Sequence, residues 1–220
     1  MPLATYTDLI AAVQKEIEGN TVFELTDDIV KDKISLVESR LNRKLRLREM
    51  EQQDTTTYTP LDTERRLDVP TFFLELLTFE FKPINAPDAE YKKLRYVSPQ
   101  RLSEYYQREL GWYTVRSDIE FNAIADQDYL LKLHYLVRWN LAAQNSNWLL
   151  TFYPDAYFYG TLLACRIYFK DTSLFEVYQS YFDEAFADLN ELDSRGRDDS
   201  ELEIDPVVLI NTSRQTSFPR

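Results

Sequence analysis

Hydrophobic residues at intervals of three and four predict two helices in the first 48 residues. The first helix, over about 5–18, has one apolar stripe, made of Leu9, Ile10, Val13 and Ile17. The second, from Thr26 to about residue 48, has another, made of Ile29, Ile34, Val37, Leu41 and Leu45. Since each helix has one apolar face to bury, we expect both to pack against further helices.

From Glu49 onwards the pattern becomes polar and rich in threonine, and then alternates as in strands. A helix is expected to begin at Ser98-Pro99 and to end near Leu110, before Gly111. Short strands are expected on either side of it, over 52–59, 65–69, 91–97, 112–116, 118–124 and 129–139. The apolar run 72–81 predicts a turn of helix followed by a strand.

Two more helices, over about 154–169 and 171–193, precede a C-terminal end of different character. After an acidic spacer, this end carries Pro206, a short β-branched run and only positive charges. Such a segment has too few apolar groups to pack by itself, so we interpret it as an arm that orders on a partner. The residues expected to bind that partner are Pro206, Val207, Val208, Leu209, Ile210, Arg214, Phe218 and Arg220.

The elements together predict a mainly α (α+β) fold. In this interpretation the N- and C-terminal helix pairs form a helical bundle, with a β-rich insertion and an extended C-terminal arm. The predicted boundaries are 1–48 for the first helix pair, 49–150 for the insertion, 151–195 for the second pair and 196–220 for the arm.

Charge changes this picture in one respect. The formal net charge is −12, whereas a protein that grips nucleic-acid phosphates needs a positive surface. The main basic cluster lies at the end of the second helix and consists of Arg40, Arg43, Lys44, Arg46 and Arg48. These cations suit the negative end of a helix dipole. They also suit contact with acidic groups of a neighbouring subunit, and nucleic acid is a weaker third option.

The sequence offers little for catalysis. Its four glycines lie far apart, and one histidine with one cysteine cannot form a usual zinc site. Cys165 is interpreted as a buried, inert thiol and His134 as a packed or surface side chain. Carboxylates are plentiful, and the candidates for a catalytic pair or a metal cluster are Asp27-Asp28, Asp126/Asp128 and Asp198-Asp199, each at a helix start or in a loop, where acids are common for capping and solubility. We expect no enzyme, cofactor or bound metal. Neither a signal peptide nor a membrane span is predicted.

Several segments resemble the head–tail connector (adaptor) proteins of tailed bacteriophages. They are Tyr6-Thr-Asp-Leu-Ile, the run from Ile34 to Glu51 that ends Leu-Arg-Leu-Arg-Glu-Met-Glu, Leu67-Asp-Val-Pro70, Asn147-Trp-Leu-Leu150 and Tyr153-Pro-Asp-Ala-Tyr-Phe-Tyr-Gly160. The resemblance covers most of residues 5–195. None of these segments is a catalytic motif.

This resemblance implies a structural virion protein, made in the host cytoplasm and placed at the head–tail interface. It implies a homo-oligomeric, twelve-fold ring beneath the portal protein that extends the channel for double-stranded DNA. The ring would offer a platform for tail or neck proteins, and the C-terminal arm would dock on the portal. The alternatives are a metal-dependent carboxylate enzyme and a DNA-binding module of a virion.

Overall fold

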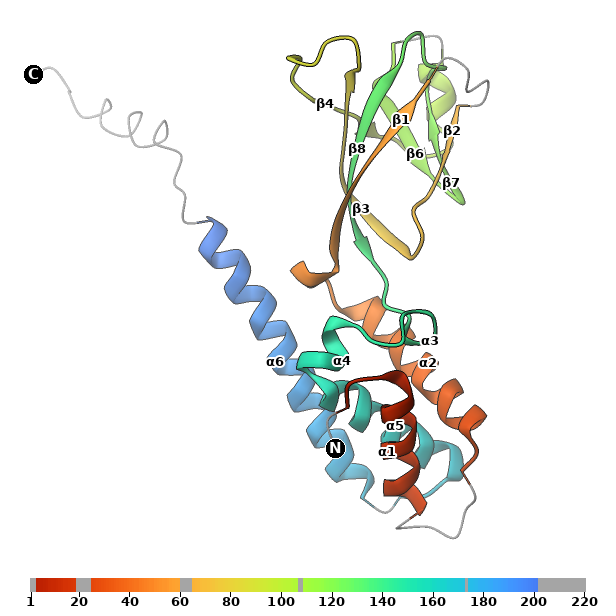
Figure 1. Cartoon of the computed structure of the whole chain (residues 1–220), viewed down its shortest axis with the longest axis vertical. Coiled ribbons are helices and arrows are strands. Elements are labelled where there is room, and N and C mark those ends of the chain that lie inside the picture. The colour runs from red at the N-terminus through yellow and green to blue at the C-terminus, as the bar shows by residue number, and fades with distance from the viewer. Residues whose placement is uncertain (1–2, 19–24, 60–64, 107–108, 173, 202–220) are drawn as a thin grey trace, which may run out of the picture. The chain divides into compact units, whose positions relative to one another are not determined.

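The structure, a computed structural model, describes residues 3–18, 25–59, 65–106, 109–172 and 174–201 (Figure 1). Of these, residues 193–201 are described by their backbone alone. The chain divides into two compact units. One unit combines Met1–Arg48 with Leu141–Arg220, and the other is Glu49–Asn140. We call them the helical unit and the strand unit.

The helical unit is built around one central helix. Its elements are α1 (Tyr6–Glu18), α2 (Asp27–Lys44), α3 (Leu141–Gln144), α4 (Trp148–Phe152), α5 (Pro154–Phe169) and α6 (Phe175–Glu201). Helix α5 contacts α1, α2, α4 and α6, and it buries residues on more than one face. The stripe predicted for α1 is confirmed, because its four members are all buried.

Gly160 is the point at which α2, α5 and α6 approach most closely. A Cβ atom at this position would lie 2.8 Å from Cγ1 of Val37 and 2.9 Å from Cε2 of Phe182. Real Cβ atoms essentially never lie that close to a neighbour, so any larger residue would force the Val37 and Phe182 side chains to move. The three helices are therefore held together at a contact that leaves no space for one methyl group.

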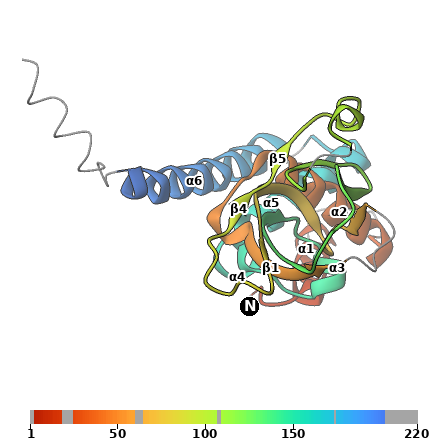
Figure 2. The same ribbon diagram turned by 90° about the horizontal axis from the view of Figure 1, so that it is seen from above.

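Helix α6 is longer than the sequence indicated. The sequence predicted that it ends near residue 193, whereas the helix continues to Glu201. Both views show its C-terminal half extending beyond α1, α2 and α5 of the same unit (Figure 1, Figure 2). The acidic spacer thus begins as helix, and only its last residues lie outside the described residues.

The strand unit contains two four-stranded sheets. The first has the order β1-β8-β3-β4, from β1 (Glu51–Tyr58), β3 (Phe73–Pro83), β4 (Lys92–Lys93) and β8 (Tyr129–Val137). Its strands are antiparallel, and β1 pairs with β8 along its whole length, from Glu51 opposite Leu136 to Tyr58 opposite Tyr129. Two register shifts interrupt the β3–β8 pairing.

The second sheet has the order β2-β7-β6-β5. It is formed by β2 (Arg66–Asp68), β5 (Arg95–Tyr96), β6 (Trp112–Val115) and β7 (Asp118–Phe121), and only the β5–β6 pair is parallel. Aromatic residues from both sheets form the core of the unit. Phe79 of β3 lies 5.2 Å from Tyr113 of β6 and 5.7 Å from Phe121 of β7, between ring centroids.

The predicted fold class is wrong. About half of the chain was expected to form a helical bundle, with the β-rich part as an insertion. The structure is an α+β fold, 46% helical and 24% strand, and its two sheets enclose a hydrophobic core of their own. The prediction failed because periodicity detects single strands but not their pairing, and β1, β3 and β8 pair across many intervening residues.

The prediction of a helix between Ser98 and Leu110 is also wrong. Among the described residues of this stretch, which exclude 107–108, helical geometry is limited to Leu102–Tyr105, a short 3-10 helix called η2. The side chain of Asn122 donates hydrogen bonds to the carbonyl oxygens of Tyr105 (3.2 Å) and Glu109 (2.9 Å). A distant amide thus binds the Tyr105 carbonyl oxygen, which a helix running to Leu110 would have paired with the backbone N–H of Glu109. A further 3-10 helix, η1 (Arg48–Met50), precedes β1.

Candidate subunit interface

An open apolar groove lies between α2, α5 and α6 of the helical unit. It encloses about 450 Å³ and includes Leu36 of α2, Ile167 and Tyr168 of α5 and Phe182 of α6. Leu36 is 58% exposed, Ile167 60% and Tyr168 51%, although each is a large apolar or aromatic residue. Single exposed apolar residues are ordinary, but several that line one groove are typical of a surface that binds a partner or a ligand.

Cations flank this apolar surface. Lys33, Arg40 and Arg43 of α2 all line the groove, and with Leu36 they follow one another at intervals of three and four. That spacing places them on one flank of the helix. The Lys33 ammonium lies 4.4 Å from the Tyr168 ring centroid, and the Arg40 guanidinium lies 5.1 Å from that of Phe182. Among the described residues, no carboxylate is paired with these three cations.

The predicted basic cluster is divided by the structure. Arg40 and Arg43 line the groove, and Lys44 lies 5.3 Å from the ring centroid of Phe186. Arg46 instead turns back on its own helix end, where Nη1 donates to the carbonyl oxygens of Asn42 (3.0 Å) and Leu45 (2.7 Å). Arg48 is exposed at the start of η1. All the residues predicted for the portal-binding arm, from Pro206 to Arg220, lie outside the described residues.

Sequence reasoning missed the apolar part of the groove. Leu36 is an apolar residue outside the stripe that α2 buries, and Ile167 with Tyr168 directly follows the buried Arg166. An apolar residue on the polar flank of an amphipathic helix was the signal that could have revealed this surface.

A buried polar network links α2, α3, α4 and α5. Tyr157 donates a hydrogen bond to Oε1 of Glu38 (3.0 Å) and accepts one from Nδ2 of Asn147 (2.9 Å). The same Glu38 oxygen accepts the backbone N–H of Leu141 at the start of α3 (2.9 Å). Asn147 also caps α4 through Leu150 N–H (2.8 Å). Two segments of the sequence resemblance, around Asn147 and Tyr157, therefore serve packing between helices.

Burial sets the ionisation of this network. The pKa of Glu38 is raised, chiefly by desolvation, although hydrogen bonds from the Leu141 backbone and from Tyr157 oppose the rise in this pKa. The pKa of Tyr157 is well above 10, because its hydroxyl is buried and lies beside Glu38. Glu38 thus favours folding most when it is protonated.

A pH-dependent stability difference follows. Since the pKa of Glu38 is higher in the folded than in the unfolded state, its contribution is complete below its ordinary pKa of 4.5 and is lost as the pH rises through the raised value. Glu38→Gln keeps an acceptor for both donors and carries no charge. We expect its free energy of unfolding to increase relative to wild type as the pH rises above 4.5 and through the raised pKa of Glu38. Urea denaturation with the exposed Glu18→Gln as control measures this, and parallel pH profiles for wild type and Glu38→Gln would contradict it.

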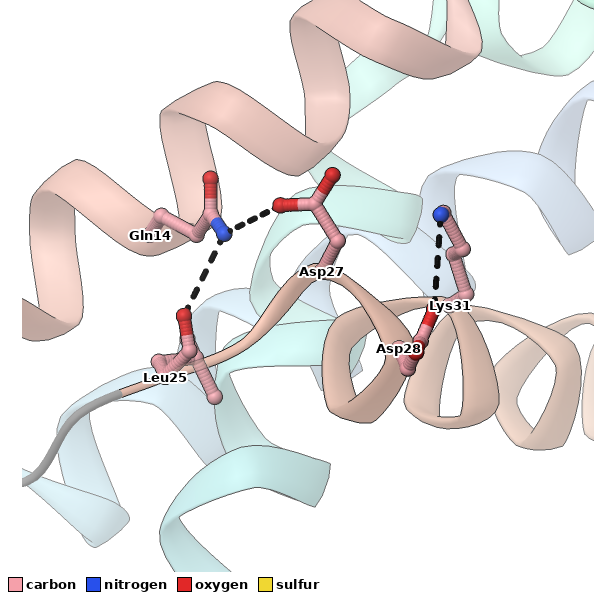
Figure 3. A network of polar contacts seen from close by, with 5 residues as sticks. All are labelled: Gln14, Leu25, Asp27, Asp28 and Lys31. Carbon is pink, nitrogen blue, oxygen red and sulfur yellow. Dashed lines mark hydrogen bonds and ion pairs between the residues drawn. The ribbon is translucent and has the colours of Figure 1, made fainter.

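The acidic pairs considered for a metal site do not form a metal-binding cluster among the described residues, and several of their side chains have ordinary structural partners. In Figure 3, Gln14 Nε2 bridges the carbonyl oxygen of Leu25 (3.2 Å) and Oδ1 of Asp27 (2.7 Å), while Asp28 pairs with Lys31 at 3.5 Å. Asp126 accepts the hydroxyl of Tyr129 at 2.6 Å. The side chains of Asp198 and Asp199 lie outside the described residues. Across the described ranges, no three His, Cys, Asp or Glu side chains gather as a metal site requires.

The two remaining reactive side chains have plain surroundings. Cys165 is buried in α5, and desolvation raises the pKa of its thiol to about 12, so it stays protonated at neutral pH. His134 lies on β8, where its Nε2 is 3.0 Å from Oε2 of Glu51. Within the described part of the chain, no helix combines the length and the apolar character that crossing a bilayer requires.

A comparison with protein-family models places the chain in a family. A family model described as SU10 adaptor protein matches residues 4–204. It confirms the resemblance to phage head–tail adaptors that the sequence segments indicated. No curated protein matches the chain.

Proposed function

Because the chain belongs to the SU10 adaptor family, a phage head–tail adaptor family, we propose that it forms a connector ring beneath the portal protein. The family assigns it a structural role in a bacteriophage virion. In the proposal, the ring extends the DNA channel and offers a docking surface to tail or neck proteins. The family match over 4–204 is the observation that carries this proposal.

Two physical features support it. The helical unit carries an apolar groove flanked by cations that no described carboxylate pairs with, a surface suited to repeated contacts between subunits. The formal net charge of −12 disfavours tight binding of phosphates, which suits a channel through which DNA must slide. The C-terminal residues 206–220 remain our proposed contact with the portal, and many arms on one ring would bind with high avidity.

Removal of residues 206–220 tests the proposal. Wild type mixed with the cognate portal protein should give a ring on the portal by electron microscopy. The truncated protein should keep its circular dichroism spectrum and thermal unfolding but lose portal binding by at least about a hundredfold, because the ordering segment supplies the anchor.

A matched variant separates the apolar run from chain length. Replacement of Val207, Val208, Leu209 and Ile210 by serine should reproduce the loss. Unchanged portal binding by both variants would contradict the assignment of the arm. Tight binding of duplex DNA that weakens steeply with added salt would instead favour a DNA-binding module.

A further inference from the structure

The groove between α2, α5 and α6 requires an occupant that is apolar in its centre and acidic at its edges. Its exposed floor is apolar, through Leu36, Ile167 and Tyr168, and its flank carries Lys33, Arg40 and Arg43. A cationic partner would be repelled, and a purely polar one would leave the apolar floor in contact with water. The chain itself is strongly acidic, so a second copy can supply such a surface.

The outer flank of α6 has the required chemistry. Val177 is 43% exposed and Tyr181 46%, although both are large and hydrophobic. Glu184 and Asp188 are exposed one and two turns further along the helix. From Phe175 to Leu192 the sequence contains no lysine or arginine, so no cation of this segment neutralises those carboxylates.

The groove and this flank are different faces of one helical unit. Phe182 and Phe186 point towards the α2 side, where Arg40 and Lys44 lie over their rings. At about 100° per residue, the stripe of Val177, Tyr181, Glu184 and Asp188 is turned away from those rings by roughly 150°. One copy can therefore offer its groove to one neighbour and its α6 flank to another.

We infer that the outer flank of α6 from one copy docks in the α2/α5/α6 groove of the next copy. Val177 and Tyr181 cover the apolar floor, and Glu184 with Asp188 faces Arg40 and Arg43. Such a head-to-tail contact closes into a ring when the rotation between copies allows it. The inference rests on the proposed ring function and adds to it the two surfaces that build the ring.

Charge reversal on each surface provides the test. Arg40→Glu with Arg43→Glu makes the groove acidic, and Glu184→Lys with Asp188→Lys makes the flank basic. Either double variant alone should weaken self-association by about a hundredfold or more, because like charges then meet in the contact. An equal mixture of the two should recover assembly, and so should one chain that carries all four substitutions. Mass photometry and analytical ultracentrifugation of the full chain, alone and with the portal protein, measure this.

Matched controls change the charge equally in the other unit. Lys92→Glu with Lys93→Glu controls for the groove variant, and Asp88→Lys with Glu90→Lys controls for the flank variant; all four residues are exposed. Both controls should assemble like wild type, and all variants should keep their thermal unfolding midpoints.

The outcomes separate the interface from the ring. If wild type assembles and both reversed variants assemble equally well, the interface is wrong while the ring proposal stands. If the Arg40→Glu, Arg43→Glu variant loses portal binding but not self-association, the groove binds the portal protein and the inference is overturned. Wild type that remains a monomer, with and without portal, overturns both.

Discussion

Asp171→Ala is expected to lower the free energy of unfolding of the helical unit by about 3–5 kcal/mol. Asp171 accepts a hydrogen bond from Nη1 of Arg166, whose side chain is only 1% exposed in the middle of the unit. The guanidinium also lies 5.7 Å from the Tyr178 ring centroid, and Tyr178 donates a hydrogen bond to Glu16 of α1. Without Asp171, a buried cation loses its carboxylate partner. That penalty is a large part of the total stability of an ordinary domain, about 5–15 kcal/mol.

Chemical denaturation followed by circular dichroism measures this loss. Asp32→Ala removes an exposed carboxylate from α2 and should change stability by less than about 0.5 kcal/mol. Combining Asp171→Ala with Arg166→Met removes both charges, so it should recover much of the loss. Equal destabilisation by the single and the combined replacement would show that the pairing of charge is not the cause.

Asn122→Leu should destabilise the strand unit by about 4 kcal/mol or more. The Asn122 side chain is fully buried. Its Oδ1 accepts the backbone N–H groups of Gly111 (3.1 Å) and Trp112 (3.0 Å), and its Nδ2 donates to the carbonyl oxygens of Tyr105 and Glu109. Leucine has a similar size but no polar atom, so four backbone groups lose one partner each, at about 1–3 kcal/mol for each group left unsatisfied.

Hydrogen exchange resolved by peptide measures this effect, because separate peptides report on the strand unit and on the helical unit. Protection should fall first between Tyr105 and Phe121, while α5 keeps its wild-type exchange. Asn85→Leu makes the same change at an exposed loop position and should have little effect. Retained protection around Gly111 in the Asn122 variant would disprove the bridging role of this side chain.

The helices and single strands of this chain were largely predictable from local patterns. Helices α1 and α5 begin and end near their predicted residues, and β8 carries the alternation of Leu131, Leu133 and Tyr135 that the sequence indicated. These elements follow from the repetition of apolar residues along one segment, which is a local property.

Features that depend on distant residues were not predictable in this way. Asn122 lies twelve residues beyond Leu110, and its side chain binds the Tyr105 carbonyl oxygen that a full helix between Ser98 and Leu110 would use internally. The β1–β8–β3 order pairs strands that are far apart in the sequence. The β-sheet part of the fold was therefore underestimated from the sequence, and a mainly helical protein was predicted.

The C-terminal extension of α6 could have been predicted from its charge pattern rather than from its apolar residues. Its last turns have no apolar stripe, but Glu191 precedes Arg195 and Asp193 precedes Arg197 by four residues, with the acid first. This order supports a helix through pairing along its surface. The charged part of the candidate interface was also predictable from the sequence, because Arg40 and Arg43 were proposed as contacts. Its apolar floor was not, because that floor forms only where α2 packs against α5.

The tight crossing at Gly160 has a kinetic consequence. Because the three helices already pack this closely in the single chain, we expect the groove beside them to be formed before any partner binds. A partner can then bind without a prior conformational change of this surface, and little binding free energy is lost to ordering it. The speed of each encounter should then be governed by diffusion and by attraction between opposite charges, and should fall as the ionic strength of the medium increases.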